Sequence, residues 1–321
     1  MKIIKRISLI VLLLLLVSGI GGYFYFKNMW AAPPNELQVS KGAIALKCTW
    51  QASAFSKREA LLLPIKLPDI DRTLYMQFDF GSPYSMLYYK TAKSIQKRYP
   101  NFKVKRNPED RKHAYEVNFS LGNLIVKAPK MRLRNYGKAI NWKNPAKIII
   151  IGTIGTDFLE RKQVIVDFKN SLVNVFDQLP DDQQNKLQMI DCSFDERRIY
   201  LSGMLDNDDK KFMYDSGCSA YSLITDANTW NKLKIPNTKP IIHQGNSWGR
   251  KLQVLTNPSK YQIDFGKVQV PLRSITHVKG AHWTQKIMMR LSGMGGMIGN
   301  HIFKENTIYI DAKNEKFAIV M

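Results

Sequence analysis

Cysteine is scarce in this chain, which has three cysteines, Cys48, Cys192 and Cys218, among its 321 residues. Three scattered cysteines are too few for a disulfide framework, and their spacing matches no zinc-binding pattern. One bridge is compatible with an oxidising compartment, and the odd count leaves a free thiol. The sequence therefore indicates neither a disulfide-rich domain nor a metal site, and we expect no metal ion and no cofactor.

Acidic residues are also few, since Asp and Glu number 26 against 48 Lys and Arg, a formal net charge of +22. The basic residues are spread along the chain, and their densest stretch, Lys97–His113, is interrupted by prolines and by Glu109 and Asp110. No zinc-finger, RNA-recognition or helix-turn-helix signature accompanies them, so we expect no nucleic-acid partner. We interpret the excess as a basic, solvated surface, with attraction to anionic lipid or an envelope polymer as a second use.

Only one long stretch is free of charge and strongly apolar, the 20 residues of Ile7–Phe26. A helix of that length spans ~30 Å, the thickness of the hydrocarbon core of a bilayer. Basic residues precede it, and aromatic residues stand where an interfacial belt lies. The alternative is a cleaved signal peptide, because Gly19–Gly21 offers small residues, but the apolar run continues past that point. We expect residues 1–30 to be an uncleaved anchor.

That orientation places the rest of the chain outside the cytoplasm, in the periplasm or at the cell surface, because basic residues favour the cytoplasmic side. Residues 31–45 contain prolines and are expected to form a stalk between the membrane and the folded part.

The folded part repeats itself, which is the most informative feature of the sequence. Three pairs of segments match without gaps at a constant separation of 144 residues. The pairs are Phe119–Val126 with Ile263–Val270, Ile154–Leu159 with Ile298–Phe303, and Val164–Asn170 with Ile308–Asn314. A fourth pair, Phe78–Leu87 and Tyr214–Leu223, is 136 residues apart, so a short insertion separates it from the others. These matches indicate an internal duplication.

The duplication predicts two lobes of the same architecture. Each half contains an alternating apolar strand, an Asp-x-Gly turn, a second strand and a hairpin around glycine, followed by an Ile-Gly element, a short helix and a closing strand. We expect a first lobe over residues 46–176, a polar connection over residues 177–198 and a second lobe over residues 199–321. The expected helices are Lys90–Tyr99, Asp157–Lys162 and Asn300–Glu305.

The two Asp-x-Gly turns, Asp79–Gly81 and Asp215–Gly217, are the candidate site. A carboxylate at the end of a buried strand is held rigidly, and the glycine lets another backbone approach. A pseudo-twofold relation would bring Asp79 and Asp215 together, and two carboxyl groups at ~3 Å share one proton. The charged member can deprotonate a water while the protonated member polarises a carbonyl, which hydrolyses an amide without a metal or a covalent nucleophile.

These turns resemble the Asp-Thr/Ser-Gly signatures of the aspartic proteases. The Ile-Gly elements at 154–155 and 298–299 resemble the hydrophobic-hydrophobic-Gly element that supports each aspartate loop in that family, and their surroundings are similar to bacterial retropepsin-like members. The resemblance runs from about Leu61 to Val320. It implies a mostly β, two-lobed aspartic-protease fold with an internal pseudo-twofold repeat, and an endopeptidase acting on polypeptides. With the apolar run, the expected fold class is this β fold plus one N-terminal transmembrane helix.

The resemblance also assigns roles to individual residues. It implies that Asp79 and Asp215 are catalytic. The residues that it implies for support of the aspartate loops are Gly81, Ser82, Ser216, Gly217, Gly155 and Gly299.

The chain departs from the family after the first aspartate. There the family has Thr or Ser, whose hydroxyl bonds to the opposite lobe; Ser216 fits this pattern, whereas Phe80 has no hydroxyl. Ser82 stands where the family often has a hydroxyl that bonds an aspartate oxygen, and Cys218 takes the equivalent place as a weak donor. Two hypotheses stay open: an active extracytoplasmic aspartic endopeptidase, or a catalytically impaired relative that binds peptides or anionic envelope polymers.

Other interpretations of the same letters are weaker. Asp79–Gly81 and Asp264–Gly266 both spell the metal-binding tripeptide of protein kinases, but the other kinase motifs are missing. Gly293–Gly299 superficially resembles a dinucleotide loop, yet it lies too near the C-terminus for a βαβ unit, so we interpret it as a flexible loop. Cys218 as a nucleophile lacks a histidine with a supporting local signature.

Overall fold

The computed structural model describes residues 31–102, 104–247, 249–280 and 294–320, together with residues 14, 17–19, 21–22, 24–25 and 28. Asn35–Met321 forms one compact unit, and Met1–Pro34 forms another. No helix within the described residues is long and apolar enough to cross a membrane. Much of Ile7–Phe26, the expected transmembrane helix, lies outside the described residues.

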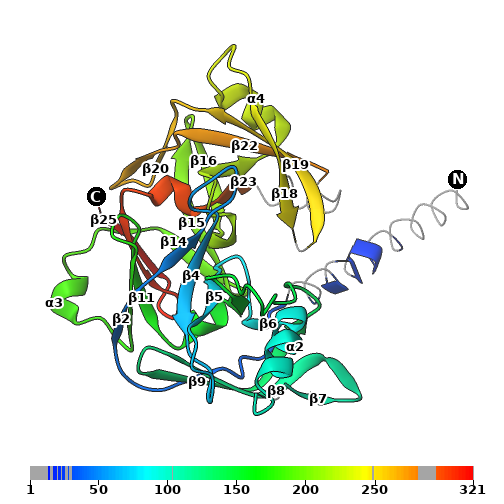
Figure 1. Ribbon diagram of the computed structural model, residues 1–321. Helices are drawn as coiled ribbons and strands as arrows, with labels where there is room; N and C mark the ends of the chain where they lie inside the picture. Colours follow the sequence, from blue (N-terminus) through cyan, green and yellow to red (C-terminus); the bar gives the residue numbers. More distant parts are fainter. Residues whose placement is uncertain are drawn as a thin grey trace, which may run out of the picture. The chain divides into compact units, whose positions relative to one another are not determined.

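The compact unit is mostly β and two-lobed, and its described residues form three sheets (Figure 1). The first sheet belongs to the first half of the chain. In spatial order its strands are β3 (Thr49–Gln51), β4 (Ala60–Ile65), β5 (Leu74–Phe78), β10 (Ile150–Ile154), β6 (Met86–Tyr88), β9 (Leu124–Arg134), β8 (Asp110–Leu121) and β7 (Lys105–Asn107), with β1 (Gln38–Val39) paired to β9.

The second half of the chain forms a sheet of its own with the same central arrangement. In spatial order its strands are β18 (Ile241–Ser247), β19 (Arg250–Pro258), β22 (Ser274–Lys279), β17 (Leu223–Thr225), β23 (Met294–Ile298), β16 (Asp208–Tyr214), β15 (Arg198–Leu205), β20 (Gln262–Asp264) and β21 (Gln269–Pro271), with β14 (Cys192–Asp195) paired to β15. In both halves an Ile-Gly strand runs parallel to the strand before the aspartate and antiparallel to the strand after it.

The third sheet is shared between the halves. Its spatial order is β13 (Met189–Ile190), β25 (Lys316–Val320), β24 (Thr307–Asp311), β11 (Gln163–Asp167), β12 (Leu172–Phe176) and β2 (Ile44–Lys47). Figure 1 shows β2 and β11, from the first half, in one group with β25 from the end of the chain. The closing strands of both expected lobes therefore leave their own lobe and pair with each other.

The pairing of β11 with β24 reveals the symmetry of the duplication. Ile165 pairs with Tyr309, and these two residues are equivalent in the repeat because they are 144 positions apart. On either side of this pair, Val164 pairs with Ile310 and Val166 pairs with Ile308. Each of these valines therefore faces the residue that is equivalent to the other valine in the repeat. Such a register is what an antiparallel pair has around a twofold axis. The pseudo-twofold axis therefore passes between Ile165 and Tyr309.

Short helices connect the strands. They are α2 (Tyr89–Arg98), α3 (Asp181–Gln184), α4 (Ala227–Leu233) and the 3₁₀ helices Thr156–Glu160, Ser216–Cys218 and Asn300–Phe303. The expected helix at Lys90–Tyr99 thus begins one residue earlier, at Tyr89, and it buries Ala92 and Ile95 on one face. The two expected helices after the Ile-Gly elements are single 3₁₀ turns.

Three expectations need correction. Part of residues 31–45, the expected stalk, belongs to the compact unit, because β1 pairs with β9, β2 pairs with β12, and Leu37 is buried. The connection over residues 177–198 is not merely a polar linker, since β13 and β14 extend two sheets. Of the loop expected over Gly293–Gly299, residues 294–298 are β23, while Gly293 lies outside the described residues.

Glycine in β23 reflects close packing rather than flexibility. Gly296 has a φ of +144°, and a Cβ there would overlap the carbonyl group of Ile224 on the neighbouring strand β17. A side chain cannot be accommodated at such an approach of two backbones. The glycine-rich sequence therefore belongs to a strand that packs tightly between β16 and β17.

Candidate functional site

Asp79 and Asp215 occupy equivalent places at the ends of two buried strands. Asp79 follows β5, and its backbone N–H donates to the carbonyl of Ile154, 3.0 Å away. Asp215 follows β16, and its N–H donates to the carbonyl of Ile298 at 2.8 Å. Each aspartate is thus anchored to the Ile-Gly strand of its own half, so its backbone has little freedom.

The glycines of the two turns allow the halves to meet. The N–H of Gly81 donates to Asp79 Oδ1 at 2.9 Å, and that of Gly217 donates to Asp215 Oδ1 at 2.8 Å. A Cβ on Gly81 would overlap the Asp215 carboxyl group, and a Cβ on Gly217 would lie 2.6 Å from Asp79 Oδ1. Each carboxyl group therefore lies against the glycine of the opposite turn.

This arrangement brings the two carboxyl groups together, since atoms of both lie within 3 Å of the point that a Cβ on Gly217 would occupy. Burial raises the pKa of both Asp79 and Asp215, and repulsion by the charge of Asp215 raises the pKa of Asp79 further. Two carboxyl groups this close cannot both ionise at low energetic cost. The two ionisation steps therefore belong to the pair, and the raised pKa of Asp79 favours its protonated form.

Ser216 joins the two halves beside the aspartates. Its hydroxyl is fully buried, accepts a hydrogen bond from the N–H of Phe80 at 2.7 Å and donates to the carbonyl of Phe78 at 2.9 Å. Both partners belong to the first half. Because the hydroxyl bonds two backbone groups that flank Asp79, it fixes the first turn relative to the second.

Phe80, which matches Ser216 in the repeat, holds its place by packing. Its side chain is 1% exposed, and its ring centroid lies 4.6 Å from that of Phe78 and 5.4 Å from that of Tyr214. The contact with Tyr214 crosses between the halves, as the hydroxyl of Ser216 does. Aromatic packing thus stands in this chain where the resemblance implies a second hydroxyl.

The residues three positions after each aspartate behave differently. Ser82 is buried, and its hydroxyl donates to the carbonyl of Tyr84 at 2.8 Å rather than to Asp79. The Cys218 thiol donates to Asp215 Oδ2 with an Sγ–Oδ2 distance of 3.3 Å. Side-chain support from this position therefore reaches the second aspartate and not the first.

Gly155 and Gly299 lie directly under the aspartate turns. A Cβ on Gly155 would lie 2.6 Å from the carbonyl oxygen of Ser82, and one on Gly299 would lie 2.5 Å from that of Tyr221. The N–H of Gly155 donates to Ser85 Oγ at 3.0 Å. Only glycine permits this contact between backbones. The Ile-Gly elements therefore support the aspartate turns by direct backbone packing.

Two groups next to the turns gave no usable signal in the sequence. Asp157 is buried and accepts hydrogen bonds at 2.7 Å from the N–H and the hydroxyl of Ser85, which fixes the chain that leaves the first turn. Burial raises the pKa of Asp157. Its place two residues after Gly155 suggested only a helix start, because the residue equivalent to Asp157 in the second half is His301.

Phe55 is the second group, and it comes from the segment between β3 and β4. Its ring stacks on His243 at 3.8 Å and lies 5.7 Å from the ring of Tyr221, so the first half reaches onto the second. Tyr221 Oη lies 2.8 Å from His243 Nε2. A single aromatic residue between Ala54 and Ser56 shows no periodicity, so no sequence pattern indicated this contact.

The described residues contain no group of three or more His, Cys, Asp or Glu placed to hold a metal ion. All three cysteines are free, with Cys48 buried and Cys192 and Cys218 partly exposed. The disulfide that the cysteine count allowed is therefore not formed.

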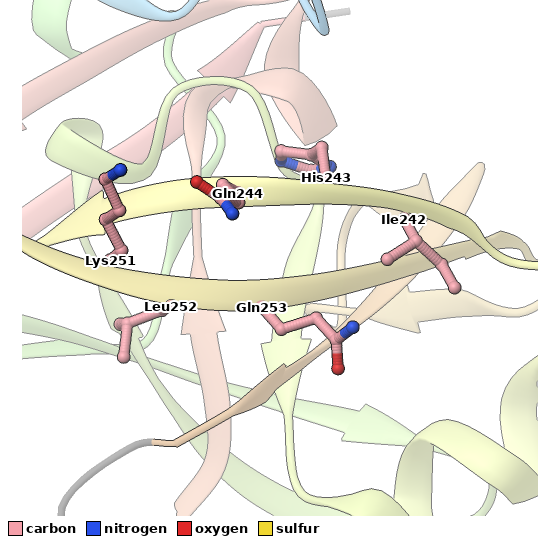
Figure 2. A pocket seen from close by; sticks show the side chains of 6 residues that line it. All are labelled: Ile242, His243, Gln244, Lys251, Leu252 and Gln253. Atoms are coloured by element: carbon pink, nitrogen blue, oxygen red, sulfur yellow. The ribbon is translucent and has the colours of Figure 1, made fainter.

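A shallow pocket lies on the hairpin of β18 and β19, away from the residues of the aspartate turns. Its lining residues are Ile242, His243, Gln244, Lys251, Leu252 and Gln253 (Figure 2). Figure 2 shows these side chains spread along the hairpin rather than converging on one point. None of them is a site residue expected from the sequence, and Lys251 is the only one with a permanent charge.

Comparison by structure finds matches for this chain, whereas comparison with family models and curated proteins does not. No model of a known protein family matches it, and no curated protein matches it. Among solved structures, the chain is similar to conglutin gamma, a basic 7S globulin from lupine seeds, over 88% of this chain and 95% of that chain. The two share 9% sequence identity, with a TM-score of 0.49.

Proposed function

We propose that this chain has the aspartic-protease fold and hydrolyses peptide bonds in polypeptides with a water held between Asp79 and Asp215. The observation that carries the proposal is the contact between one carboxyl group from each half of a duplicated chain, each at the end of a buried strand. The geometric and electrostatic requirements of two-carboxylate hydrolysis are one shared proton, rigid support and a low-dielectric setting.

In the proposed reaction the ionised carboxylate takes a proton from the water as the water attacks the scissile carbonyl carbon. The protonated carboxyl group donates its proton to the carbonyl oxygen, so no full negative charge develops there. The resulting tetrahedral species collapses when the leaving nitrogen receives a proton from the carboxyl group that took one in the first step. The C–N bond breaks, the other carboxylate takes a proton from one hydroxyl of the tetrahedral species as a new carboxyl terminus forms, and the pair again holds one proton.

The surrounding residues act on this reaction through position. The hydroxyl of Ser216 and the close contacts at Gly81 and Gly217 hold the carboxyl groups against each other before a substrate arrives. A displacement of about 1 Å in such an arrangement can slow a reaction ~10²-fold.

The test uses the chain from residue 31 onward and an unfolded protein as substrate. Cleavage is expected for the wild type, and Asp215→Asn should abolish it because an amide can neither take nor give the required proton. Asp264→Asn is the matched control. Asp264–Gly266 has the same sequence, Asp-Phe-Gly, as Asp79–Gly81, but it lies on the β20–β21 hairpin. As in the aspartate turns, the N–H of the glycine donates to the aspartate, here from Gly266 to Asp264 Oδ1 at 2.7 Å. Undiminished cleavage by Asp215→Asn would remove the mechanism.

We propose further that residues 1–30 anchor the chain in a membrane and that the compact unit acts outside the cytoplasm. The support is the uncharged run Ile7–Phe26 with basic residues before it. The full chain should remain with membranes after alkaline extraction, and the chain from residue 31 should be released. Release of the full chain by alkali, or a mature N-terminus near residue 22, would contradict the anchor and favour a signal peptide.

Two observations favour a second function, the binding of peptides or anionic envelope polymers without cleavage. Phe80 is packed in the position of the missing hydroxyl, and the net charge of +22 suits a polyanion. This alternative predicts no cleavage at any pH between about 3 and 8, a range that covers the titration of a carboxyl pair, with binding that weakens as salt increases.

Phe80→Thr separates the two functions. If the lost hydroxyl limits catalysis, the variant should cleave faster per folded molecule, although removal of a buried ring lowers stability by about 2 to 4 kcal/mol. Phe80→Leu controls for the loss of the ring, because it removes aromatic packing without adding a hydroxyl. Equal activity in the two variants would show that the hydroxyl is not the limitation.

A further inference from the structure

The two members of the carboxyl pair have unequal hydrogen-bond donors. Asp215 Oδ1 accepts from the N–H of Gly217, and its Oδ2 accepts from the thiol of Cys218 at 3.3 Å. Asp79 Oδ1 accepts from the N–H of Gly81, whereas the hydroxyl of Ser82 is engaged by the carbonyl of Tyr84. The pseudo-twofold symmetry of the backbone is thus broken by the side chains at positions 82 and 218.

The setting of Cys218 keeps it a donor. Its side chain packs against the buried cluster of Ala220, Tyr221, Ile224 and Val254. Burial, together with the neighbouring charge of Asp215, raises the pKa of the thiol. The group therefore keeps its proton near neutral pH, where it can donate a hydrogen bond but carries no charge.

A donor that bonds a carboxylate stabilises its ionised form. Because the thiol reaches only the second aspartate, the negative charge of the singly protonated pair is more stable on Asp215 than on Asp79. Asp79 then keeps the proton, because burial and the charge of Asp215 both raise the pKa of Asp79.

We propose that Cys218 is a positioning residue that places the charge of the pair on Asp215, so that Asp215 is the general base and Asp79 the general acid when substrate arrives. The inference rests on the proposed peptidase function for its consequence in catalysis. The placement of the proton, however, is a property of the free protein and is measurable without a substrate.

Other titratable groups act on the pair more weakly and are the same in all variants. Tyr88 is near Asp79, Tyr214 is near Asp215, and Glu59 is near Cys218. Burial raises the pKa of both tyrosines, so both are neutral over the range in which the pair takes up its second proton.

The experiment follows the carboxyl carbons of the pair by NMR of aspartate-labelled full-length protein during a pH titration, with Asp79→Asn and Asp215→Asn as assignments. In the wild type, Asp215 should carry the charge after the first ionisation. Cys218→Ala should move that step to higher pH by about 0.5 to 1 unit, a size suited to a weak donor. Cys218→Ser should restore or lower it, because a hydroxyl is the stronger donor.

The matched control is Cys192→Ser, whose thiol donates to the carbonyl of Glu315 and does not contact the pair. It should leave the titration unchanged. The acid limb of kcat/KM against pH should move with the NMR titration in each variant. If the loss of the thiol acted only by loosening the packing, Cys218→Ala and Cys218→Ser would both lower stability without opposite shifts in the titration.

The outcomes separate the two proposals. Ionisation of Asp79 before Asp215, or a Cys218→Ala titration that superimposes on the wild type, overturns the role of Cys218 whether or not the protein cleaves peptides. The expected shifts in a protein that cleaves nothing would support the role of Cys218 and reject the peptidase function.

Discussion

The hydroxyl oxygen of Ser216 lies 2.7 Å from the backbone nitrogen of Phe80, across the boundary between the two halves. The same oxygen donates to the carbonyl of Phe78 at 2.9 Å. The first half donates no equivalent hydroxyl to the second half, because the residue that matches Ser216 is Phe80, whose ring is buried. The rigidity of the aspartate pair therefore depends on one serine, reinforced by aromatic packing.

Ser216→Ala should weaken both the fold and the site. The substitution leaves the N–H of Phe80 and the carbonyl of Phe78 buried without this partner, which costs about 2 to 4 kcal/mol. Looser placement of the aspartates should lower kcat/KM by ~10²-fold at a temperature where the variant is folded. Chemical unfolding and peptide-cleavage kinetics measure the two effects.

Ser219→Ala is the control for that change. The Ser219 hydroxyl is equally buried, but it donates to the carbonyl of Ser216 and accepts from Asn300 Nδ2, both at 2.7 Å and both within the second half. We expect a similar loss of stability with a much smaller loss of kcat/KM. Equal kinetic losses in the two variants would refute a special role for the hydroxyl that joins the halves.

Gly81→Ala should disable the site with little change in secondary structure. The new methyl group would overlap the carboxyl group of Asp215, which must move away from Asp79. With the carboxyl groups separated, repulsion by Asp215 falls and the pKa of Asp79 should move toward the ordinary value of aspartate. Cleavage assays and the NMR titration check this result, and a variant with wild-type activity would show that the contact is dispensable.

The raised pKa values of the pair predict a specific dependence of stability on pH. A carboxyl group whose pKa is raised by folding binds its proton more tightly in the folded chain. Its stabilising contribution is therefore present at low pH and is lost as the pH rises through the raised pKa. Asp79→Asn removes one such group, so the variant should lose less stability than the wild type between about pH 4 and 8.

Thermal unfolding of both proteins across this range provides the measurement. Asp157 also has a pKa raised by burial, but it is present in both proteins and cancels in the comparison. Parallel stability curves would mean that folding does not raise the pKa of Asp79.

The duplicated letters allowed a good part of the fold to be predicted. Because a duplicated chain tends to fold with symmetry, the separation of 144 residues predicted related halves, and Ile165 and Tyr309 pair with that symmetry. Alternating apolar residues before Asp79 and Asp215 predicted the strands that carry them. The shared sheet was not predicted, since nothing local in β11 or β24 says which distant strand completes its pairing.

Details of the site depended on side-chain directions that no spacing determines. Ser82 and Cys218 are equivalent in the repeat. The hydroxyl of Ser82 nevertheless donates to the carbonyl of Tyr84, whereas the thiol of Cys218 donates to Asp215. The two residues of β1 are too few to show alternation, so the segment before residue 45 resembled a stalk. Long-range packing decided each of these features.

The most direct test of the account compares Asp79→Asn, Asp215→Asn and the double variant on one polypeptide substrate, with circular dichroism to confirm folding. Groups that act as a unit lose their joint effect when either is removed. Each single variant should therefore fall to the uncatalysed background, and the double variant should be no slower than either. Substantial cleavage by one single variant, or losses that multiply in the double variant, would contradict a shared proton between Asp79 and Asp215.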